Sequence, residues 1–240
     1  MNRASIRHLA QHAVGTRRSR GAVLLGGLLA VAAATGIVLS QIDGSQPSRA
    51  SSAVAPVVAS AAPEAPATPS PAEKVLEAQF QQQPNFYWCG PAAARNALAA
   101  GGYAVTQADM ASKLRTTTSG TDSAFDVTRG LNEIVGADVY QTREIRGQVA
   151  TPAETGQLQT DVVRAVTDGR AVVANIVTSA WDTNGISHSF DGGHYVAIVG
   201  YKDGGRIVKV ADSANPNGDG TYWMTTDNMA TWIARRGYSF

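Results

Sequence analysis

The order of helical and strand patterns along the 240-residue chain predicts an α+β fold. Helical signals come first, with an alanine-rich stretch at 91–100 and apolar residues at helical spacing near 158–166. Short β-branched runs follow at 171–177 and 195–201, and an alternating segment lies at 206–212. Because the strands follow the helices and do not alternate with them, a doubly wound parallel sheet is not expected.

Start and stop signals place the helices. Pro91 suits the first position of a helix, and Gly101 stands just past its end. Two capping-box patterns indicate two further short helices: Thr106-x-x-Asp109 and Ser123-x-x-Asp126. The apolar residues at helical spacing near 158–166 predict another helix, and Gly169 is its stop signal.

Residues 1–42 have the composition of a signal peptide or a signal anchor. Five arginines precede an uncharged run at 21–42, whose 22 residues can span a bilayer that needs about 20. Positive charge stays on the cytoplasmic side, so we expect the rest of the chain to lie outside the membrane. Ala32-Ala33-Ala34 offers small residues for cleavage but lies within the apolar run, so a secreted and a membrane-anchored form both remain open.

A linker follows at 43–72. Six of the ten prolines lie between Pro47 and Pro71, in a stretch of mainly Ala, Pro, Ser and Val that is typical of a flexible tether. The remainder, 73–240, has a globular composition and the size of one domain. The formal net charge of +1 gives no reason to expect a nucleic-acid partner, and we expect a monomer.

Cys89 is the only cysteine, so no intramolecular disulfide can form. A lone cysteine is often a small buried apolar residue. Here Cys89-Gly90-Pro91 places the thiol directly before a predicted helix. The partial positive charge of a helix N-terminus favours the thiolate, which is the nucleophilic form. The position therefore suits a catalytic nucleophile.

A cysteine nucleophile needs a base, and histidine is the usual one. His8 and His12 precede the apolar run, which leaves His188 and His194. His194 follows Gly192-Gly193, and these glycines would allow another backbone or a substrate to approach closely. His188 lies in a polar segment and is interpreted as an exposed loop histidine.

A third group should orient the base. The segments 195–201 and 206–212 resemble a hairpin; with a loop at 202–204, Tyr201 would face Gly205 and His194 would face Asp212. A one-residue slip would move the two side chains to opposite faces. Without the hairpin, Asp212 would be interpreted as a turn residue, and Asn215 is a weaker candidate for the orienting group.

Acyl transfer also needs hydrogen-bond donors for the developing oxyanion. Three glutamines, Gln81-Gln82-Gln83, lie just before Cys89, and a side-chain amide there could complement the Cys89 backbone N–H. They could equally be polar loop residues. Local physical chemistry does not choose among the three.

Several motifs together resemble those of C39-like peptidases, a family of the papain-like superfamily. They are Gln83, Tyr87-Trp88-Cys89-Gly90-Pro91-Ala92-Ala93, Gly193-His194-Tyr195-Val196-Ala197-Ile198-Val199-Gly200-Tyr201 and Val210-Ala211-Asp212. The resemblance implies a papain-like fold, with an N-terminal helical half carrying the cysteine and an antiparallel β half carrying the histidine and aspartate. It also implies that Gln83, six residues before Cys89, is the oxyanion donor.

The best-known C39 peptidases are cytosolic domains of bacteriocin-exporting transporters and cut after a double-glycine leader. This chain has no transporter domain and is expected outside the membrane, so that substrate does not carry over. The expected function is an exported thiol peptidase acting on peptide or isopeptide bonds through Cys89, His194, Asp212 and Gln83. A cell-wall peptide hydrolase, an acyl transferase with the same triad and a non-catalytic binding module are the alternatives.

Other chemistries lack their motifs. The sequence has no His-Glu-x-x-His, phosphate-loop or Gly-x-Ser-x-Gly pattern. One cysteine cannot build a structural zinc site. Asn215-x-Asn217-x-Asp219-Gly220 resembles the start of an EF-hand loop, but its twelfth position would be Thr226, where glutamate is required. We therefore expect no metal and no cofactor.

Overall fold

The structure, a computed structural model, describes residues 70–77, 79–215 and 217–240. The predicted signal segment at 1–42 and nearly all of the predicted linker at 43–72 lie outside the described residues. Within the described ranges, no helix has the length and apolar character needed to cross a membrane. Packing of the folded part begins at Pro71, whose carbonyl accepts a hydrogen bond from the Tyr201 hydroxyl at 3.1 Å.

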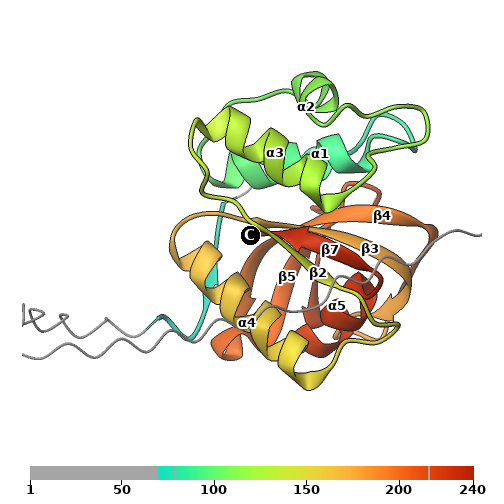
Figure 1. Cartoon of the computed structure of the whole chain (residues 1–240). Coiled ribbons are helices and arrows are strands. Elements are labelled where there is room, and N and C mark those ends of the chain that lie inside the picture. Colours follow the sequence, from blue (N-terminus) through green and yellow to red (C-terminus); the bar gives the residue numbers. More distant parts are fainter. Residues whose placement is uncertain (1–69, 78, 216) are drawn as a thin grey trace, which may run out of the picture. The chain divides into compact units, whose positions relative to one another are not determined.

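Five α-helices cover two faces of one sheet (Figure 1). On one face lie α1 (Cys89–Ala100), α2 (Gln107–Lys113) and α3 (Ala124–Val135). On the other lie α4 (Pro152–Thr167) and α5 (Thr226–Ile233). The sheet is therefore enclosed between two helical layers.

The sheet has seven strands, and all its pairings are antiparallel. The strands are β1 (Lys74–Val75), β2 (Thr142–Ile145), β3 (Val172–Trp181), β4 (Ser187–Lys202), β5 (Ile207–Ala211), β6 (Thr221–Thr225) and β7 (Arg236–Ser239). Their order is β2-β7-β3-β4-β5-β6, and β1 pairs with β4. The long strand β4 lies at the centre and carries the residues around His194.

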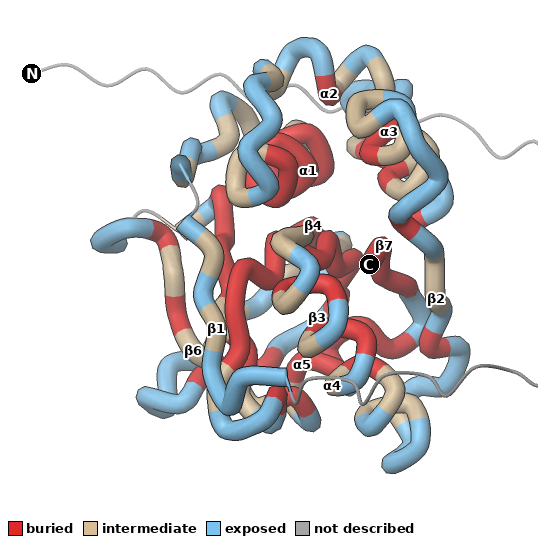
Figure 2. Tube along the Cα trace, turned by 90° about the vertical axis from the view of Figure 1, so that its left-hand side faces the viewer, coloured by how far each residue is buried: buried red, intermediate tan, exposed pale blue. Residues whose placement is uncertain are grey.

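Helix α1 begins at Cys89, two residues before the predicted start at Pro91. Its small alanines allow it to lie close against the sheet, and Figure 2 shows it buried along nearly its whole length. Gly90 is required by this packing, because a Cβ there would lie 2.4 Å from the Thr121 hydroxyl oxygen. The thiol is thus fixed where the helix meets the sheet.

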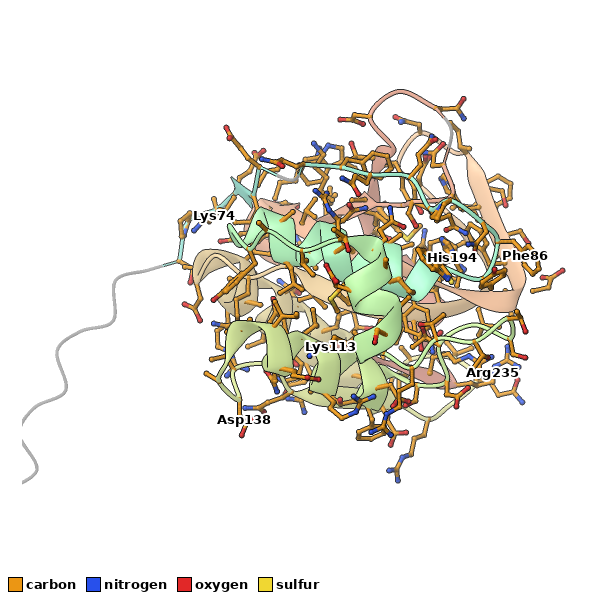
Figure 3. All side chains as sticks on the ribbon, turned by 90° about the horizontal axis from the view of Figure 1, so that it is seen from above. Lys74, Phe86, Lys113, Asp138, His194 and Arg235 are labelled. Atoms are coloured by element: carbon orange, nitrogen blue, oxygen red, sulfur yellow. The ribbon has the colours of Figure 1, made fainter. Side chains whose placement is uncertain are left out.

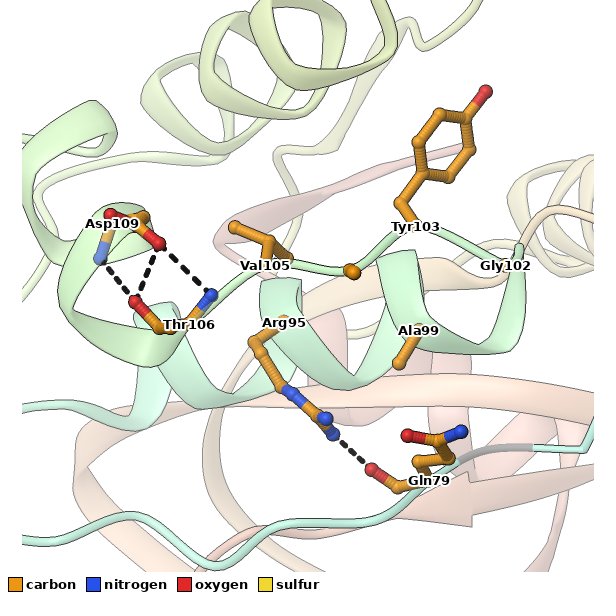
Figure 4. Close-up of a pocket in the computed structure, with 9 residues that line it drawn as sticks. Gln79, Arg95, Ala99, Gly102, Tyr103, Val105, Thr106 and Asp109 are labelled. Atoms are coloured by element: carbon orange, nitrogen blue, oxygen red, sulfur yellow. Dashed lines mark hydrogen bonds between the residues drawn. The ribbon is translucent and has the colours of Figure 1, made fainter.

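The predicted caps open the neighbouring helices. Thr106 and Asp109 form a reciprocal capping box at the start of α2 (Figure 4). Ser123 accepts a hydrogen bond from the Asp126 backbone N–H, but its hydroxyl donates to the Asp126 carboxylate, so the box is only half formed. Figure 4 also shows Arg95 of α1 bonded to the carbonyl of Gln79, which ties the segment before Cys89 to the helix.

A hydrophobic core lies on each face of the sheet. The α1 side contains Val173, Tyr195, Ala197 and Val199 together with residues of α1, α2 and α3. The opposite side contains the residues of β3 and β4 that alternate with these, such as Val196 and Ile198. They pack with Leu158 and Val162 of α4 and Trp232 of α5. This two-faced burial explains why the central strands have continuous apolar sequences without clear alternation.

The hairpin between β4 and β5 differs from the predicted register. Tyr201 pairs with Val208, where the sequence predicted Gly205, because the chain turns through a 3₁₀ turn at Asp203–Gly205. A β-bulge at Val199 then shifts the pairing by one residue. His194 and Asp212 are therefore not directly opposite each other, but the bulge returns them to the same face.

The predicted α+β class is confirmed, with Cys89 in the N-terminal helical half and His194 and Asp212 in the antiparallel half. The segregation is less complete than expected, because α5 lies between β6 and β7. The short strands β1, β2, β6 and β7 were not predicted from the sequence. Each has five residues or fewer, which is too short to show a clear period.

Candidate active site

Cys89 is the first residue of α1 and is 8% exposed. It borders a pocket of about 200 Å³ whose walls also include Thr121, Asn175 and His194. In the view from above, His194 is labelled on the side of the molecule where α1 begins (Figure 3). The nucleophile and the base predicted from the sequence therefore share one pocket.

His194 lies on β4 and is 4% exposed. Its Nε2–H donates to Asp212 Oδ1 at 2.8 Å, which leaves Nδ1 for Cys89. The Phe190 ring stacks on the imidazole, with centroids 3.9 Å apart and planes at 14°. Because Phe190 covers one face of the ring, it restricts the ring's rotation and shields the bond to Asp212 from water.

Asp212 follows strand β5 and is 1% exposed. Besides His194, its carboxylate accepts the Ala214 backbone N–H at 2.9 Å through Oδ1 and the Tyr222 hydroxyl at 3.2 Å through Oδ2. Three donors thus compensate the loss of water around this buried carboxylate. They also fix the direction in which it accepts the imidazole N–H.

The electrostatics couple these groups. Burial tends to raise the pKa of the Cys89 thiol, but the hydrogen bond and charge of His194, with the backbone N–H groups of Tyr195 and Gly90, bring it below its ordinary value. Burial tends to lower the pKa of His194, yet Asp212 and Cys89 raise it to about 9. Burial also opposes the Asp212 charge, but the bond and charge of His194 lower the pKa of Asp212. The arrangement favours a thiolate–imidazolium pair.

Gln83 is bonded to Ser213, the residue after Asp212, and is not among the residues that line the pocket of Cys89. Its backbone N–H donates to the Ser213 carbonyl at 3.0 Å, and its side-chain oxygen accepts the Ser213 hydroxyl at 3.0 Å. The side-chain nitrogen donates to the Asn85 carbonyl at 2.8 Å. One amide N–H of Gln83 therefore remains for another acceptor. Gln82 is exposed, and its amide donates to the Asn215 carbonyl.

The interpretation of His188 as an exposed loop histidine is wrong. It lies on β4, its side chain is 13% exposed, and it bonds to buried Asp182 at 3.2 Å. Its ring stacks on Tyr222 at 3.9 Å between centroids. His188 therefore packs behind the residue that donates to Asp212, and it does not reach the pocket of Cys89.

Sequence reasoning missed three residues around the predicted triad: Phe190, Tyr222 and Arg236. Phe190 and Tyr222 come from segments whose pairing depends on the register of β4 and β6. Arg236 lies on the last strand and borders the pocket of Cys89. Within the described part of the chain, no three His, Cys, Asp or Glu side chains gather as a metal site would require.

Comparisons with known proteins give a family match and several similar solved structures. A model of the Peptidase_C39 like family matches residues 75–240. Among solved structures, a candidate C39-like peptidase from Bacillus anthracis is 14% identical, with a TM-score of 0.46, covering 69% of this chain and 96% of that one. Xylellain, a cysteine protease from Xylella fastidiosa, is 13% identical, with a TM-score of 0.42 and coverages of 71% and 86%. No curated protein matches the chain.

The pKa shifts predict how Cys89 reacts with iodoacetamide. Alkylation of the wild-type protein should stay fast at pH 6, because His194 remains protonated up to about pH 9 and stabilises the thiolate. In His194→Ala the stabilising charge is lost while burial remains, so labelling should move to alkaline pH. Rates measured across pH 5–10 check this. Equal profiles for the two proteins, both rising near the ordinary thiol pKa of about 8.5, would refute the ion pair.

Removing the Tyr222 hydroxyl should destabilise the fold in a pH-dependent way. Tyr222→Phe should cost about 1.5–3 kcal/mol, the usual value for a hydrogen bond to a charged group. Because the pKa of Asp212 is lower when folded, this stabilisation is present above the unfolded value of about 4 and is lost as the pH falls through the folded value. Urea unfolding at pH 7 and at pH 3 measures the difference.

Tyr140→Phe is the matched control. Tyr140 is also buried, at 4% exposed, but its hydroxyl has no hydrogen-bond partner among the described residues. It should change the free energy of unfolding by less than Tyr222→Phe, and equally at both pH values. The same loss in both variants would mean that the bond to Asp212 contributes nothing specific.

Proposed function

The chain belongs to the C39-like peptidase family, a family of cysteine peptidases, and from that premise we propose that it cleaves peptide or isopeptide bonds through Cys89, His194 and Asp212. The observation that supports this most is the buried bond of 2.8 Å between His194 and Asp212 beside the pocket of Cys89. A buried charged pair beside a thiol of lowered pKa is typical of a catalytic site, which favours the peptidase over a non-catalytic binding module.

The proposed reaction has two halves. The Cys89 thiolate attacks the carbonyl carbon of the scissile bond, and an S–C bond forms. The His194 imidazolium gives its proton to the leaving amine as the C–N bond breaks, leaving an acyl-enzyme. Water then loses a proton to His194 and attacks the acyl carbon, which releases the acid and restores the thiolate. Asp212 holds the imidazole in one orientation throughout.

Gln83 is the proposed oxyanion donor, together with the Cys89 backbone N–H. Its contacts with Asn85 and Ser213 hold the side chain in place and leave one amide N–H unused. A donor held in advance needs no reorganisation as negative charge develops, and this is the property that such a site requires.

Export is proposed from residues 1–42, where arginines precede an uncharged run of 22 residues. The peptidase would then act outside the membrane, tethered by the segment at 43–72 or released after cleavage of the leader.

The proposed roles predict distinct effects on turnover. Cys89→Ser should fold but cleave no member of a library of linear and cross-bridged peptides. Gln83→Ala should lower kcat by roughly 10²–10³-fold with little change in KM, because the donor acts in the transition state. Its alkylation by iodoacetamide should hardly change, since alkylation builds no oxyanion. Steady-state kinetics on the best library substrate provide the measurement.

Two controls separate catalysis from loop packing. Gln81→Ala and Gln82→Ala each remove an exposed amide of the same loop and leave the contacts of Gln83 in place. Both should retain most activity. Near-wild-type kcat in Gln83→Ala would exclude its role, and equal losses in all three variants would indicate a folding effect of the loop.

The export proposal predicts the location of a reporter. An alkaline phosphatase domain fused after Ala72, which is active only outside the cytoplasm, should give full activity in cells. Replacing the five arginines before the apolar run by glutamate should reduce that activity, because orientation follows positive charge. Activity only from a cytoplasmic reporter would overturn the proposed topology.

A further inference from the structure

A positively charged side chain borders the same pocket as Cys89. Arg236 begins β7, and β7 pairs with β3 through Ala174 and Tyr238. Extending this register by two residues places Arg236 level with Ile176, which pairs with His194 on β4. The sheet therefore places a guanidinium and the imidazole at the same level of three adjacent strands. Figure 3 labels the preceding residue, Arg235, on the same side of the molecule as His194.

Gly193 lies beside this guanidinium. A Cβ built on Gly193 would lie 3.5 Å from Arg236 Nη2, so the side chain rests against the backbone immediately before His194. Gly193 also has a φ of +92°, a conformation that side-chain-bearing residues rarely adopt. The positive φ accounts for glycine at this position, and the distance shows that Arg236 packs against the backbone before His194.

The guanidinium has no anionic partner in the part of the chain that the structure describes. Among the described residues, Arg236 forms no salt bridge and no side-chain hydrogen bond, whereas arginines such as Arg143, Arg146 and Arg206 are paired with carboxylates. Asp122, the acidic residue that lines the pocket, is not bonded to it. Apart from the Cys89–His194 pair, the other walls, including Asn175 and Thr121, are neutral. Arg236 therefore offers its fork of N–H donors to whatever enters the pocket.

We propose that Arg236 makes this pocket a subsite for a carboxylate of the substrate, within two residues of the scissile bond. This inference rests on the proposed role of Cys89 as nucleophile. Guanidinium and carboxylate match in a bidentate geometry, and the pocket of about 200 Å³ accommodates a small group. The carboxylate can belong to an Asp or Glu side chain or to the C-terminus of a peptide, and both present the same chemistry.

Alkylation tests the subsite without any need for turnover. Iodoacetate and iodoacetamide both lose iodide as an S–C bond forms with Cys89, but only iodoacetate carries a carboxylate. Arg236→Gln should lower the ratio of the iodoacetate rate constant to the iodoacetamide rate constant by about fivefold or more, which is the effect of one nearby charge. Any change in the thiol pKa affects both reagents and cancels in the ratio. Asp122→Asn should raise the ratio, because it removes a repelling charge.

Arg206→Gln is the matched control, since Arg206 pairs with Asp203 at the hairpin turn and does not line the pocket. It should leave the ratio unchanged. A ratio that is the same in wild type and Arg236→Gln would overturn the proposal. Weakening of the wild-type ratio by 0.5 M NaCl should accompany the positive result, because salt screens exposed charges.

Peptides identify the source of the carboxylate. Pairs of substrates with Glu or Gln at each of two positions on either side of the cut, with free or amidated C-termini, should show one carboxylate preferred by about 10–100-fold in kcat/KM. Arg236→Gln should abolish that preference, so that the ratio of kcat/KM for the carboxylate peptide to its neutral counterpart falls to about one. Cleavage without any charge preference would overturn the subsite but leave the peptidase intact. A charge-dependent alkylation ratio without cleavage of any peptide would support the anion site and refute the peptidase function.

Discussion

The buried hydrogen bond between His194 and Asp212 sets the requirements that the surrounding structure meets. Both side chains are at most 4% exposed, and removing two ionisable groups from water is costly unless every polar atom finds a partner. Asp212 therefore needs the Ala214 N–H and the Tyr222 hydroxyl as well as the imidazole. These contacts determine where the loop after β5 turns and where β6 lies. Strand β6, which carries Tyr222, is therefore part of the site.

The second constraint is the face of the sheet on which each side chain of strand β4 lies. Tyr195, Ala197 and Val199 face the α1 side, whereas Tyr201 belongs to the opposite core, although an unbroken strand would keep all four on one face. The bulge at Val199 accounts for the switch. Because of the bulge, Val199 is buried on the α1 side and Tyr201 in the opposite core. His194 nevertheless lies on the same face of the sheet as Asp212. Stability of the core and geometry of the site therefore depend on one irregularity.

Local signals predicted the parts of the molecule that depend on local physics. The helix behind Cys89, the Thr106 cap and the apolar strands follow from propensity, capping and hydrophobic runs. The hairpin register did not follow, because it depends on a turn longer than expected and a bulge without a sequence signature. The predicted His194–Asp212 contact is nevertheless present, because the two register differences together preserve the face. Tyr222 and Arg236 reach the site through long-range strand pairing, which no local pattern encodes.

The charges around Cys89 bear on which substrate charge the site would favour. In the ion-pair state the thiolate and the Asp212 carboxylate carry two negative charges, and the His194 imidazolium carries one positive charge. A site of this kind alone repels an acidic substrate, and Asp122 at the pocket adds to the repulsion. Arg236 offsets this excess at the pocket wall, beside the backbone that leads into His194. The guanidinium lies outside the buried His194–Asp212 pair. The proposed selection for the substrate's charge therefore leaves the bond between the imidazole and the Asp212 carboxylate intact.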